Sequence, residues 1–501
     1  MLIAIKRCLI VGIGIIIQLG FPIIVRLFFH EHSMIISIIY KMLSILIVLK
    51  ILKDSVRLSN DLPWIILILL FPIFGTIVLI TIGRNFTKSK LLRNVYYTEN
   101  KYNKYLKQDE KTKEEIEKES MENLQYIINR TAYPITKNNQ VTYYEFGEKF
   151  YPDLLAELKK AEKFIFMEYF IIDEGVMWDG ILEILKEKAN SGVDVRIIYD
   201  DAGSVAMLAA SYPKELAKFN IKCITFNKLS PFRGIFMNNR DHRKMTIIDG
   251  KVAFSGGLNL RDEYININSR LGVWKDNGIK IVGDAIWNLT VMFLTMWNAN
   301  LKEDDDLEKF KYDFKNEIPE DGYVVPYGVS PLHKDLIGED IYINMITSAK
   351  KYLYIMTPYL IIDTDLVNAL IRTAKRGVDV RIIVPGIPDK KIVYTQTTSF
   401  FKLLHDNGVK IYKYKVGFVH AKVFLSDDTK AIVGTINLDY RSLYLHFENG
   451  IYLEKNKEID KIKKDFTETF EQCEKLTDKA VKTNIFKSIW QSILRLFAPL
   501  F

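Results

Sequence analysis

The chain carries two copies of one histidine-centred motif, and this duplication constrains its fold more than any other feature. DHRKMTIIDGKVAFSGGLN (241–259) and VHAKVFLSDDTKAIVGTIN (419–437) share the spacing His-x-Lys-x4-Asp and a trailing Gly and Asn. Lys and Asp each make up about 6% of an average chain, so a histidine meets both by chance roughly once in 300. The chain has only seven histidines, so two matches exclude coincidence. The motif residues are His242, Lys244, Asp249 and Asn259 in the first copy, and His420, Lys422, Asp427 and Asn437 in the second.

The sequence around the motifs repeats as well. KFIFMEYFII (163–172) and VDVRIIYDDAGS (193–204) read as buried strands that flank a helix closed by glycine, ILEILKEKANSG (181–192). KKYLYIMTPYLIID (350–363) and RGVDVRIIVPG (376–386) resemble the two strands. We therefore predict an α/β protein with two duplicated domains that share one active site. The domains are expected at 136–320 (motif 237–264) and 321–501 (motif 415–442).

Residues 1–83 are predicted to form a membrane anchor. Cys8–Val25 and Leu62–Ile82 carry no charge, and the second is long enough to cross a hydrocarbon core of about 30 Å. Between them, Met34–Leu52 carries Lys41 near its middle, which costs about 3 kcal/mol on insertion scales. Two and three spans both remain open. The basic residues that follow Ile82 favour a multi-pass protein of the cell membrane with its catalytic domains on the cytoplasmic face.

Charge distinguishes the remaining segments. Residues 84–135 include the run KQDEKTKEEIEKE (107–119) and are predicted to be a solvated, charged helical linker. The closing stretch TNIFKSIWQSILRLFAPLF (483–501) is amphipathic, and it could dock on the domain core or lie in a membrane interface. The net charge of +8 suits an anionic partner, either nucleic acid or an acidic membrane. The three cysteines are far apart and indicate neither a disulfide framework nor a zinc site.

The motif suits phosphoryl transfer on a diester. Period-two geometry places His242 and Lys244 on one strand face, and Asp249-Gly250 is a hairpin turn signal. One histidine can attack phosphorus while the second protonates the leaving alkoxide and then deprotonates the incoming hydroxyl. Two lysines and two asparagines would stabilise the phosphorane oxygens. This chemistry needs no metal and no cofactor, and we expect both halves to face one site.

The carboxylates allow more than one interpretation. Asp249, which belongs to an Asp-Gly turn, could serve the turn alone. Glu263 and Glu448 follow the motifs and could orient the imidazoles through Nδ1. The other histidines, which lack a lysine two residues on, are predicted to play no part: His30, His32, His333, His405 and His446.

These residues resemble the phospholipase D superfamily, whose mark is a doubled HxKxxxxD followed by GxxN. HRKMTIIDGKVAFSGGLNLRDEY, GVWKDN, TPYLIID, GVDVRIIVPGIPDK and GTINLDYRSLYLHFE look like the bacterial cardiolipin synthases of that superfamily, as does the apolar N-terminus ending in GRNF. PYGVSP (326–331) departs from the Ser-Gly-Pro-like residues usual there. The resemblance implies condensation of two phosphatidylglycerols into cardiolipin and glycerol through a phosphohistidine. It also implies that the paired His, Lys and Asp residues form the active site, with His242 as nucleophile.

Three other functions fit parts of the sequence. The motif alone does not separate a cardiolipin synthase from another phosphatidyltransferase or a hydrolase of the superfamily. A nuclease would suit the positive charge, but the apolar spans confine the site to a lipid surface, so we expect phosphatidylglycerol and other anionic phospholipids as partners and no nucleic acid. A non-catalytic lipid-binding scaffold is disfavoured because both motifs are complete.

Overall fold

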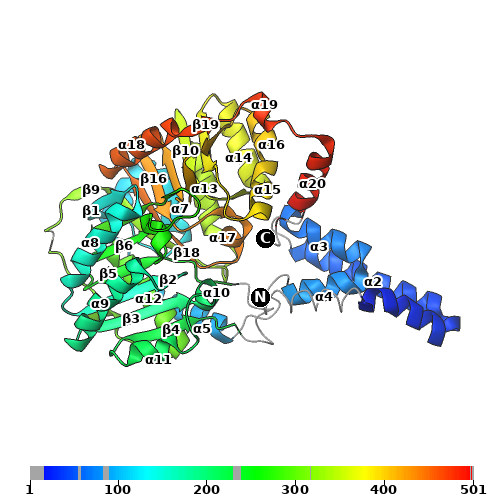
Figure 1. Ribbon diagram of the computed structural model, residues 1–501, viewed down its shortest axis with the longest axis horizontal. Helices are drawn as coiled ribbons and strands as arrows, with labels where there is room; N and C mark the ends of the chain where they lie inside the picture. The colour runs from blue at the N-terminus through cyan, green and yellow to red at the C-terminus, as the bar shows by residue number, and fades with distance from the viewer. Residues whose placement is uncertain are drawn as a thin grey trace. The chain divides into compact units, whose positions relative to one another are not determined.

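The computed structural model describes residues 16–54, 58–82, 90–229, 239–315, 317–496 and 498. The chain forms two compact units (Figure 1). The larger unit comprises residues 90–228 and 239–491, and the smaller comprises 1–89, 229–238 and 492–501. The larger unit holds both histidine motifs.

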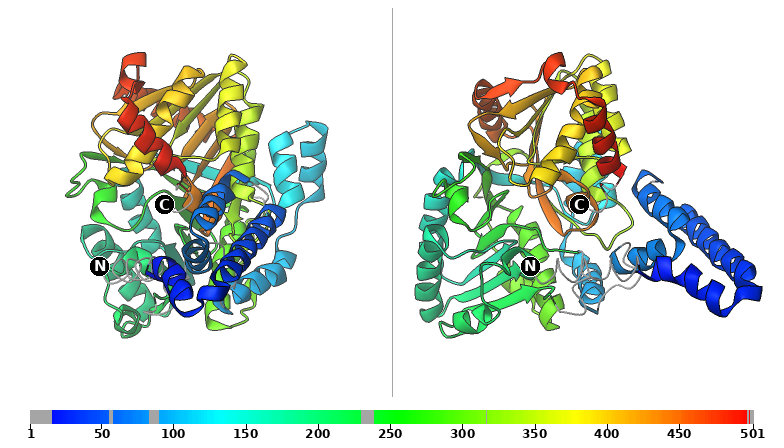
Figure 2. Two further views of the ribbon diagram at one scale, coloured as in Figure 1. Left: turned by 90° about the vertical axis from the view of Figure 1, so that its right-hand side faces the viewer. Right: turned by 45° about the vertical axis from the view of Figure 1, so that its right-hand side comes forward.

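The larger unit is built on one mixed sheet of 15 strands within the described residues, and its strand order repeats about the centre (Figures 1 and 2). Outward from the centre, the first half runs β1 (Thr136–Tyr144), β8 (Gly278–Gly283), β6 (Val252–Gly256), β5 (Met245–Ile248), β2 (Phe164–Tyr169), β3 (Asp194–Asp200) and β4 (Lys222–Phe226). The second half runs β9 (Glu320–Val329), β18 (Glu448–Glu454), β16 (Lys430–Gly434), β15 (Val423–Ser426), β10 (Tyr352–Met356), β12 (Asp379–Pro385) and β13 (Lys410–Tyr414), with β19 (Cys473–Lys475) at the edge.

This order is a pseudo-twofold arrangement. β1 pairs antiparallel with β9 at the centre, and every strand outward has a counterpart in the other half, except the edge strand β19. Each half contains a parallel pair, β2–β3 or β10–β12. The next two strands toward the centre form the antiparallel hairpin that carries the motif aspartate, β5–β6 or β15–β16. The predicted α/β duplication is therefore confirmed, and the two halves join into one continuous sheet.

Helices cover the sheet and follow the same repeat. The larger are α8 (Gly147–Lys159), α9 (Val176–Asn190) and α12 (Ile286–Leu301) in the first half, and α13 (Ile337–Ser348), α14 (Thr364–Lys375) and α18 (Glu458–Glu471) in the second. Shorter elements are α10 (Asp201–Ser204), α11 (Tyr212–Ala217), α15 (Lys391–Ser399), α16 (Phe401–Asp406), α17 (Tyr440–Tyr444) and α19 (Asp478–Val481). Two small parallel ladders join β7 (Val273–Lys275) to β14 (Gly417–Val419), and β11 (Leu360–Ile361) to β17 (Leu438–Asp439).

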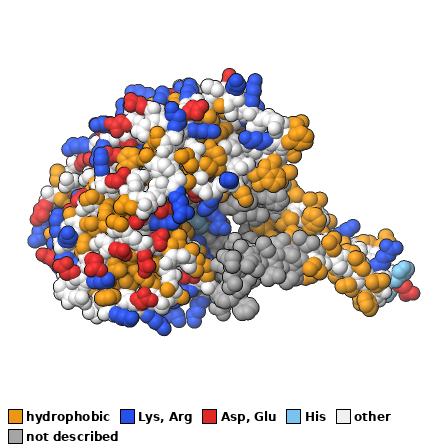
Figure 3. All heavy atoms as spheres, in the orientation of Figure 1, with side chains coloured by type: hydrophobic (Ala, Val, Ile, Leu, Met, Phe, Trp, Pro, Cys, Tyr) orange, Lys and Arg blue, Asp and Glu red, His pale blue; other side chains and the backbone are white. Residues whose placement is uncertain are grey.

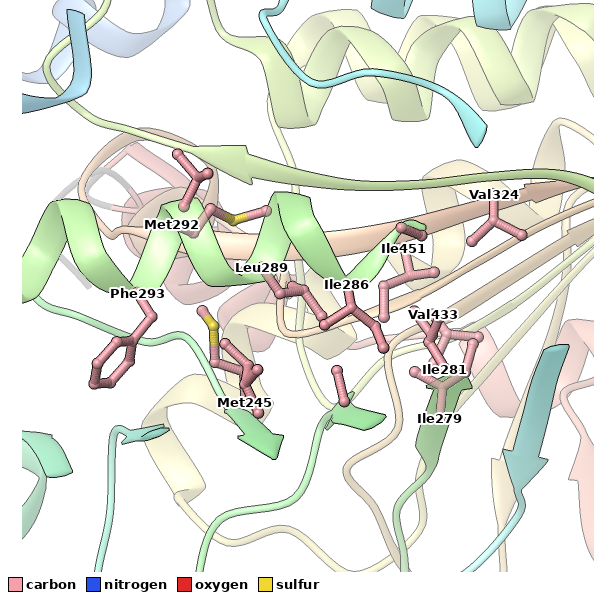
Figure 4. Close-up of a cluster of buried hydrophobic side chains, with 14 of the residues drawn as sticks. Met245, Ile279, Ile281, Ile286, Leu289, Met292, Phe293, Val324, Val433 and Ile451 are labelled. Carbon is pink, nitrogen blue, oxygen red and sulfur yellow. The ribbon is translucent and has the colours of Figure 1, made fainter. Parts of the chain in front are cut away.

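Helix α12 fixes the two halves to each other. Figure 4 shows its apolar side chains among strands of both halves. The residues in contact are Ile286, Leu289, Met292 and Phe293 of α12, Met245, Ile279 and Ile281 of the first half, and Val324, Val433 and Ile451 of the second. All lie in one buried hydrophobic cluster. Because close-packed cores resist deformation, the strands that carry the two motifs keep a fixed separation.

The prediction of a solvated linker at 84–135 is wrong in part. Residues 90–130 do form helices, namely α5 (Lys90–Tyr102), α6 (Glu110–Lys118) and α7 (Glu122–Arg130). Each buries an apolar stripe while its charged residues face outward, as Val95, Ile116 and Ile127 show. The charge run hid this stripe, because a helix needs only a few apolar residues at spacings of three and four to pack on a core.

The smaller unit corrects the predicted membrane spans. Leu62–Ile82 is not one helix, because α3 (Leu58–Leu70) ends before Pro72 and α4 (Pro72–Ile82) starts anew. Proline lacks the N–H that a continuing helix needs and disfavours helical backbone at the residue before it. α4 packs closely on α3, since a Cβ on Gly75 would lie 2.7 Å from the Leu67 carbonyl oxygen. The first two amides after Pro72 donate instead to Gln18 Oε1, at 3.0 and 3.1 Å.

The described residues contain one helix that is long and apolar enough to cross a membrane. It spans His30–Asp54, includes α2 (Ser33–Asp54), and contains the segment that Lys41 had made doubtful. Figure 3 shows hydrophobic side chains along its surface. The predicted first span, Cys8–Val25, lies partly outside the described residues. Its described part belongs to a shorter apolar helix, Ile16–Phe28.

Candidate active site

Each motif lies on a tight hairpin, as predicted. His242 and Lys244 immediately precede β5, and β5 turns into β6 through Asp249 and Gly250 with φ of 55° and 69°. In the second half, Asp427 and Asp428 turn β15 into β16 with φ of 55° and 59°. Positive φ at both central residues gives a turn whose twist matches that of its strands, so each hairpin is a rigid support for its histidine.

The two motif aspartates, predicted among the catalytic residues, lie at the turns and hold backbone. Asp249 accepts hydrogen bonds from three consecutive amides, those of residues 162–164, at 2.7–2.8 Å. Asp427 accepts from the amides of residues 350–352 at 2.7–2.9 Å. Each carboxylate thus fastens the hairpin to the start of β2 or β10. With their oxygens so occupied, these aspartates hold the motif hairpins in position.

The two motif imidazoles are held by the opposite half of the chain. His242 Nδ1 lies 2.9 Å from both carboxylate oxygens of Glu448, and His420 Nδ1 lies 2.6 Å from Asp276 Oδ2. The backbone follows the same exchange. His242 N donates to the Phe447 carbonyl at 2.8 Å, and His420 N donates to the Lys275 carbonyl at 2.7 Å. Each half therefore supplies the orienting carboxylate for the other half's histidine.

One of the two predicted orienting residues is wrong. Glu448 does contact His242, but Glu263 pairs with Arg261 at 2.9 Å on the cavity wall. Asp276 takes the place expected for Glu263. The signal that identifies Asp276 is a further repeat, because Asp276-Asn277-Gly278 and Glu448-Asn449-Gly450 both lead into the strand beside the motif hairpin.

The lysines are buried beside their histidines. Lys244 Nζ donates to the His242 carbonyl at 2.6 Å, and Lys422 Nζ lies 2.8 Å from His420 Nδ1. Burial lowers the pKa of Lys244 to about 7 and that of Lys422 to about 8. A bound phosphodiester anion would favour the charged form of both ammoniums.

Burial also keeps the imidazoles neutral. It lowers the pKa of His420 to about 4, with the Lys422 charge acting in the same direction. It holds the pKa of His242 well below the usual value, again with the neighbouring lysine adding to the effect. Burial alone would raise the pKa of Asp276, but attraction to His420 and Lys422 outweighs it and the pKa falls. A neutral imidazole with Nδ1 on a carboxylate presents a lone pair at Nε2, as a nucleophile requires.

Both histidines line one cavity of about 820 Å³, a volume in the range of small-molecule sites. Asn259 and Asn437 line it as well. The Asn259 amide donates to the Tyr264 hydroxyl at 2.7 Å, whereas Asn437 Oδ1 has no hydrogen-bond partner among the described residues. The structure thus brings the predicted histidines and asparagines together.

A third histidine, which the sequence had suggested was uninvolved, lies in the same cavity. The His446 ring centroid is 5.6 Å from that of His242. His242, His446 and Glu448 each offer a metal-ligand atom within 4.8 Å of the others. The buried ammonium of Lys244 bonds to the His242 carbonyl beside them, and this positive charge favours an anion over a cation. His446 has no lysine two residues later, so the motif pattern in the sequence did not identify it as a site residue.

The fold and the two cross-held His–Lys hairpins define a phospholipase D-like phosphatidyltransferase. Residues 154–297 and 342–472 match the family described as cardiolipin synthase, PLD-like domain. The chain belongs to this cardiolipin synthase family.

Relatives of similar length match across most of the chain. The cardiolipin synthases of Geobacillus kaustophilus and Alkalihalophilus pseudofirmus are 34% and 32% identical to it, over 91% and 93% of this chain and 92% and 93% of theirs. An uncharacterized protein of Streptococcus mutans is 42% identical over 90% of this chain and 99% of its own length. The crystal structure of phosphatidylserine synthase from Haemophilus influenzae has the same fold, with a TM-score of 0.54 at 15% identity over 72% of this chain and 93% of that one.

Proposed function

We propose that this chain transfers a phosphatidyl group from one phosphatidylglycerol to the headgroup hydroxyl of a second, giving cardiolipin and glycerol. The observation that carries the proposal is the pair of imidazoles, each held at Nδ1 by a carboxylate from the other half, at one cavity. The two buried lysines give that cavity the positive charge that a phosphodiester needs. Membership of the cardiolipin synthase family supports the choice of both substrates.

The reaction proceeds in two balanced steps. The bound phosphodiester anion, together with Asp276, favours the protonated form of His420. In the first step, His242 Nε2 attacks phosphorus, the bond to the glycerol oxygen breaks, and protonated His420 gives its Nε2 proton to that oxygen. In the second, the hydroxyl of another phosphatidylglycerol gives its proton to His420 and attacks phosphorus, and the phosphorus–nitrogen bond breaks. Lys244 and Lys422 balance the negative charge of the phosphorane oxygens in both steps. Asn259 and Asn437 contact the same oxygens.

The products distinguish this function from hydrolysis. With phosphatidylglycerol in mixed vesicles, the purified full chain should form cardiolipin and glycerol in equal amounts, and a chelator should leave the rate unchanged. The reason is that two imidazoles and two ammoniums supply the nucleophile, the acid and the charge without a metal ion. Lipid chromatography with glycerol quantified in parallel provides the measurement. Phosphatidic acid as the main product would identify a hydrolase instead.

We further propose that the chain crosses the membrane more than once and keeps its catalytic unit on the cytoplasmic face. The basic residues after Ile82 support this orientation. The C-terminal helix α20 (Ile485–Leu496) supports a membrane surface nearby, because Phe486 and Trp490 are 81% and 55% exposed while Gln491 is only 4% exposed. From residue 479 to the C-terminus the chain has four basic residues and no acidic one, which complements an anionic bilayer.

Protease accessibility tests the orientation. Protease added to inside-out membrane vesicles should degrade the catalytic unit, because that face corresponds to the cytoplasm. The same protease should leave it intact in sealed right-side-out vesicles until detergent is added. Degradation in the right-side-out vesicles alone would place the catalytic unit on the opposite face.

A further inference from the structure

His446 is a buried imidazole without a hydrogen-bond partner among the residues that the structure describes. It is 8% exposed, and neither Nδ1 nor Nε2 bonds to any described residue. Its nearest carboxylate oxygen, Glu448 Oε1, is 3.9 Å from Nδ1, which is too long for a hydrogen bond. Glu448 is in any case occupied by His242 and by the Thr435 hydroxyl. Buried polar groups are nearly always bonded, so the missing partner is expected to come from the cavity that His446 lines.

The pseudo-twofold of the sheet places Trp274 at the position equivalent to His446. Each lies two residues before the orienting carboxylate, Asp276 or Glu448. Each also lies against the opposite half's reactive histidine, with ring centroids 5.6 Å apart in both cases. The two sides differ in polarity, because Trp274, Tyr264 and Phe418 pack on His420, whereas Phe170 and His446 pack on His242. The histidines, lysines and orienting carboxylates of the two halves are thus nearly symmetric, whereas the side chains that pack on the histidines are not.

The two side chains offer different hydrogen bonds. The Trp274 indole N–H is also buried, with no hydrogen-bond partner in the described part of the chain, but an indole can only donate. Burial, together with the charges of Arg441 and Arg240, holds the pKa of His446 well below its usual value, so the imidazole is neutral. A neutral imidazole offers one donor and one acceptor. Its complement is a group that both accepts and donates, which is a hydroxyl rather than a phosphate oxygen.

We propose that His446 binds a free hydroxyl of the glycerol headgroup and thereby selects glycerol-bearing lipids over water and over headgroups without hydroxyls. The inference rests on the proposed function, in which the leaving glycerol and the glycerol of the incoming lipid occupy the same subsite in the two steps. His446 is then a specificity residue that contacts substrate. It takes no part in breaking the ester bond.

Donors with and without headgroup hydroxyls test the subsite. His446→Leu removes both hydrogen-bonding atoms, and it should lower kcat/KM for phosphatidylglycerol roughly tenfold or more. With a phosphatidyl nitrophenyl ester, whose leaving group has no hydroxyl to bind, release of nitrophenol by the variant should stay within about twofold of the unmodified chain. His446→Asn restores a donor and an acceptor, and should recover part of the loss on phosphatidylglycerol. His405→Leu serves as the matched control, because His405 pairs with Asp478 and does not line the cavity.

The product ratio gives a second, independent measurement. Because the incoming lipid loses a contact and water does not, His446→Leu should raise the ratio of phosphatidic acid to cardiolipin. An equal loss on both donors would overturn the proposal and indicate that His446 acts through Glu448 on His242. No loss on either donor would overturn it as well. If the unmodified chain made no cardiolipin, the proposed function itself would fail, and that result is distinguishable from both.

Discussion

Replacing either reactive histidine should remove nearly all turnover. His242→Asn and His420→Asn are each expected to lower the rate roughly 10⁴-fold or more, because one site needs both a nucleophile and an acid/base. The rate of cardiolipin formation in vesicles measures the effect. His405→Asn, which changes an imidazole outside the cavity, should leave the rate near that of the unmodified chain. A variant at either motif that kept about half the activity would show two independent sites.

The same variants identify the nucleophile. His420→Asn lacks the acid, so a donor that needs no proton on its leaving group, such as a phosphatidyl nitrophenyl ester, should still load the enzyme. The label should then persist, because no base activates an acceptor, and as a phosphoramidate it should survive alkali and be lost in acid. Peptide mapping should place it on His242. Label on His420 in the His242→Asn variant alone would reverse the assignment, and absence of label in both would indicate direct transfer.

The second large effect is expected at the exchanged carboxylates. Glu448→Gln and Asp276→Asn should each lower kcat by about 10²- to 10⁴-fold with little change in folding. In Glu448→Gln, an amide that donates to His242 Nδ1 would move the imidazole proton to Nε2 and remove the lone pair that attacks phosphorus. In Asp276→Asn, the loss of the carboxylate would remove the charge that favours the protonated form of His420, which the leaving glycerol needs as its acid. Steady-state kinetics gives kcat, and the thermal unfolding midpoint checks the fold.

Glu263→Gln is the matched control for the carboxylate variants. Glu263 lines the same cavity but pairs with Arg261, so we expect it to keep most of its activity. If Glu263→Gln lowered kcat as much as Asp276→Asn, Glu263 would be an orienting carboxylate, as the sequence had suggested. That result would also argue against the exchange of carboxylates between the two halves.

Local patterns predicted the duplicated sheet and the hairpins, because repeated strands and Asp-Gly turns are short-range signals. The site residues reached by such signals include both histidines and both asparagines, which meet at the cavity. They also include both lysines, which are buried beside their histidines. Asp276 and His446 were missed for one physical reason. Each lies against a histidine in the other half, 144 or 204 positions away, and that proximity depends on how β1 joins β9. The helix of residues 30–54 was judged a doubtful membrane span because the cost of Lys41 was given more weight than the helix length. The helix break at Pro72 was missed because the segment was assessed by its apolar composition alone.

The exchange of carboxylates also bears on how such a chain can change over time. His242 depends on a residue 206 positions later, and His420 on one 144 positions earlier. If one half lost its carboxylate, the histidine of the other half would lose its orienting partner. Selection on each histidine therefore also acts on the opposite half. A half-length ancestor would have needed two identical copies, each completing its neighbour's active site. Fusion of those copies would have released positions such as 274 and 446 from having to be identical, so that a symmetric enzyme could acquire two distinct sides.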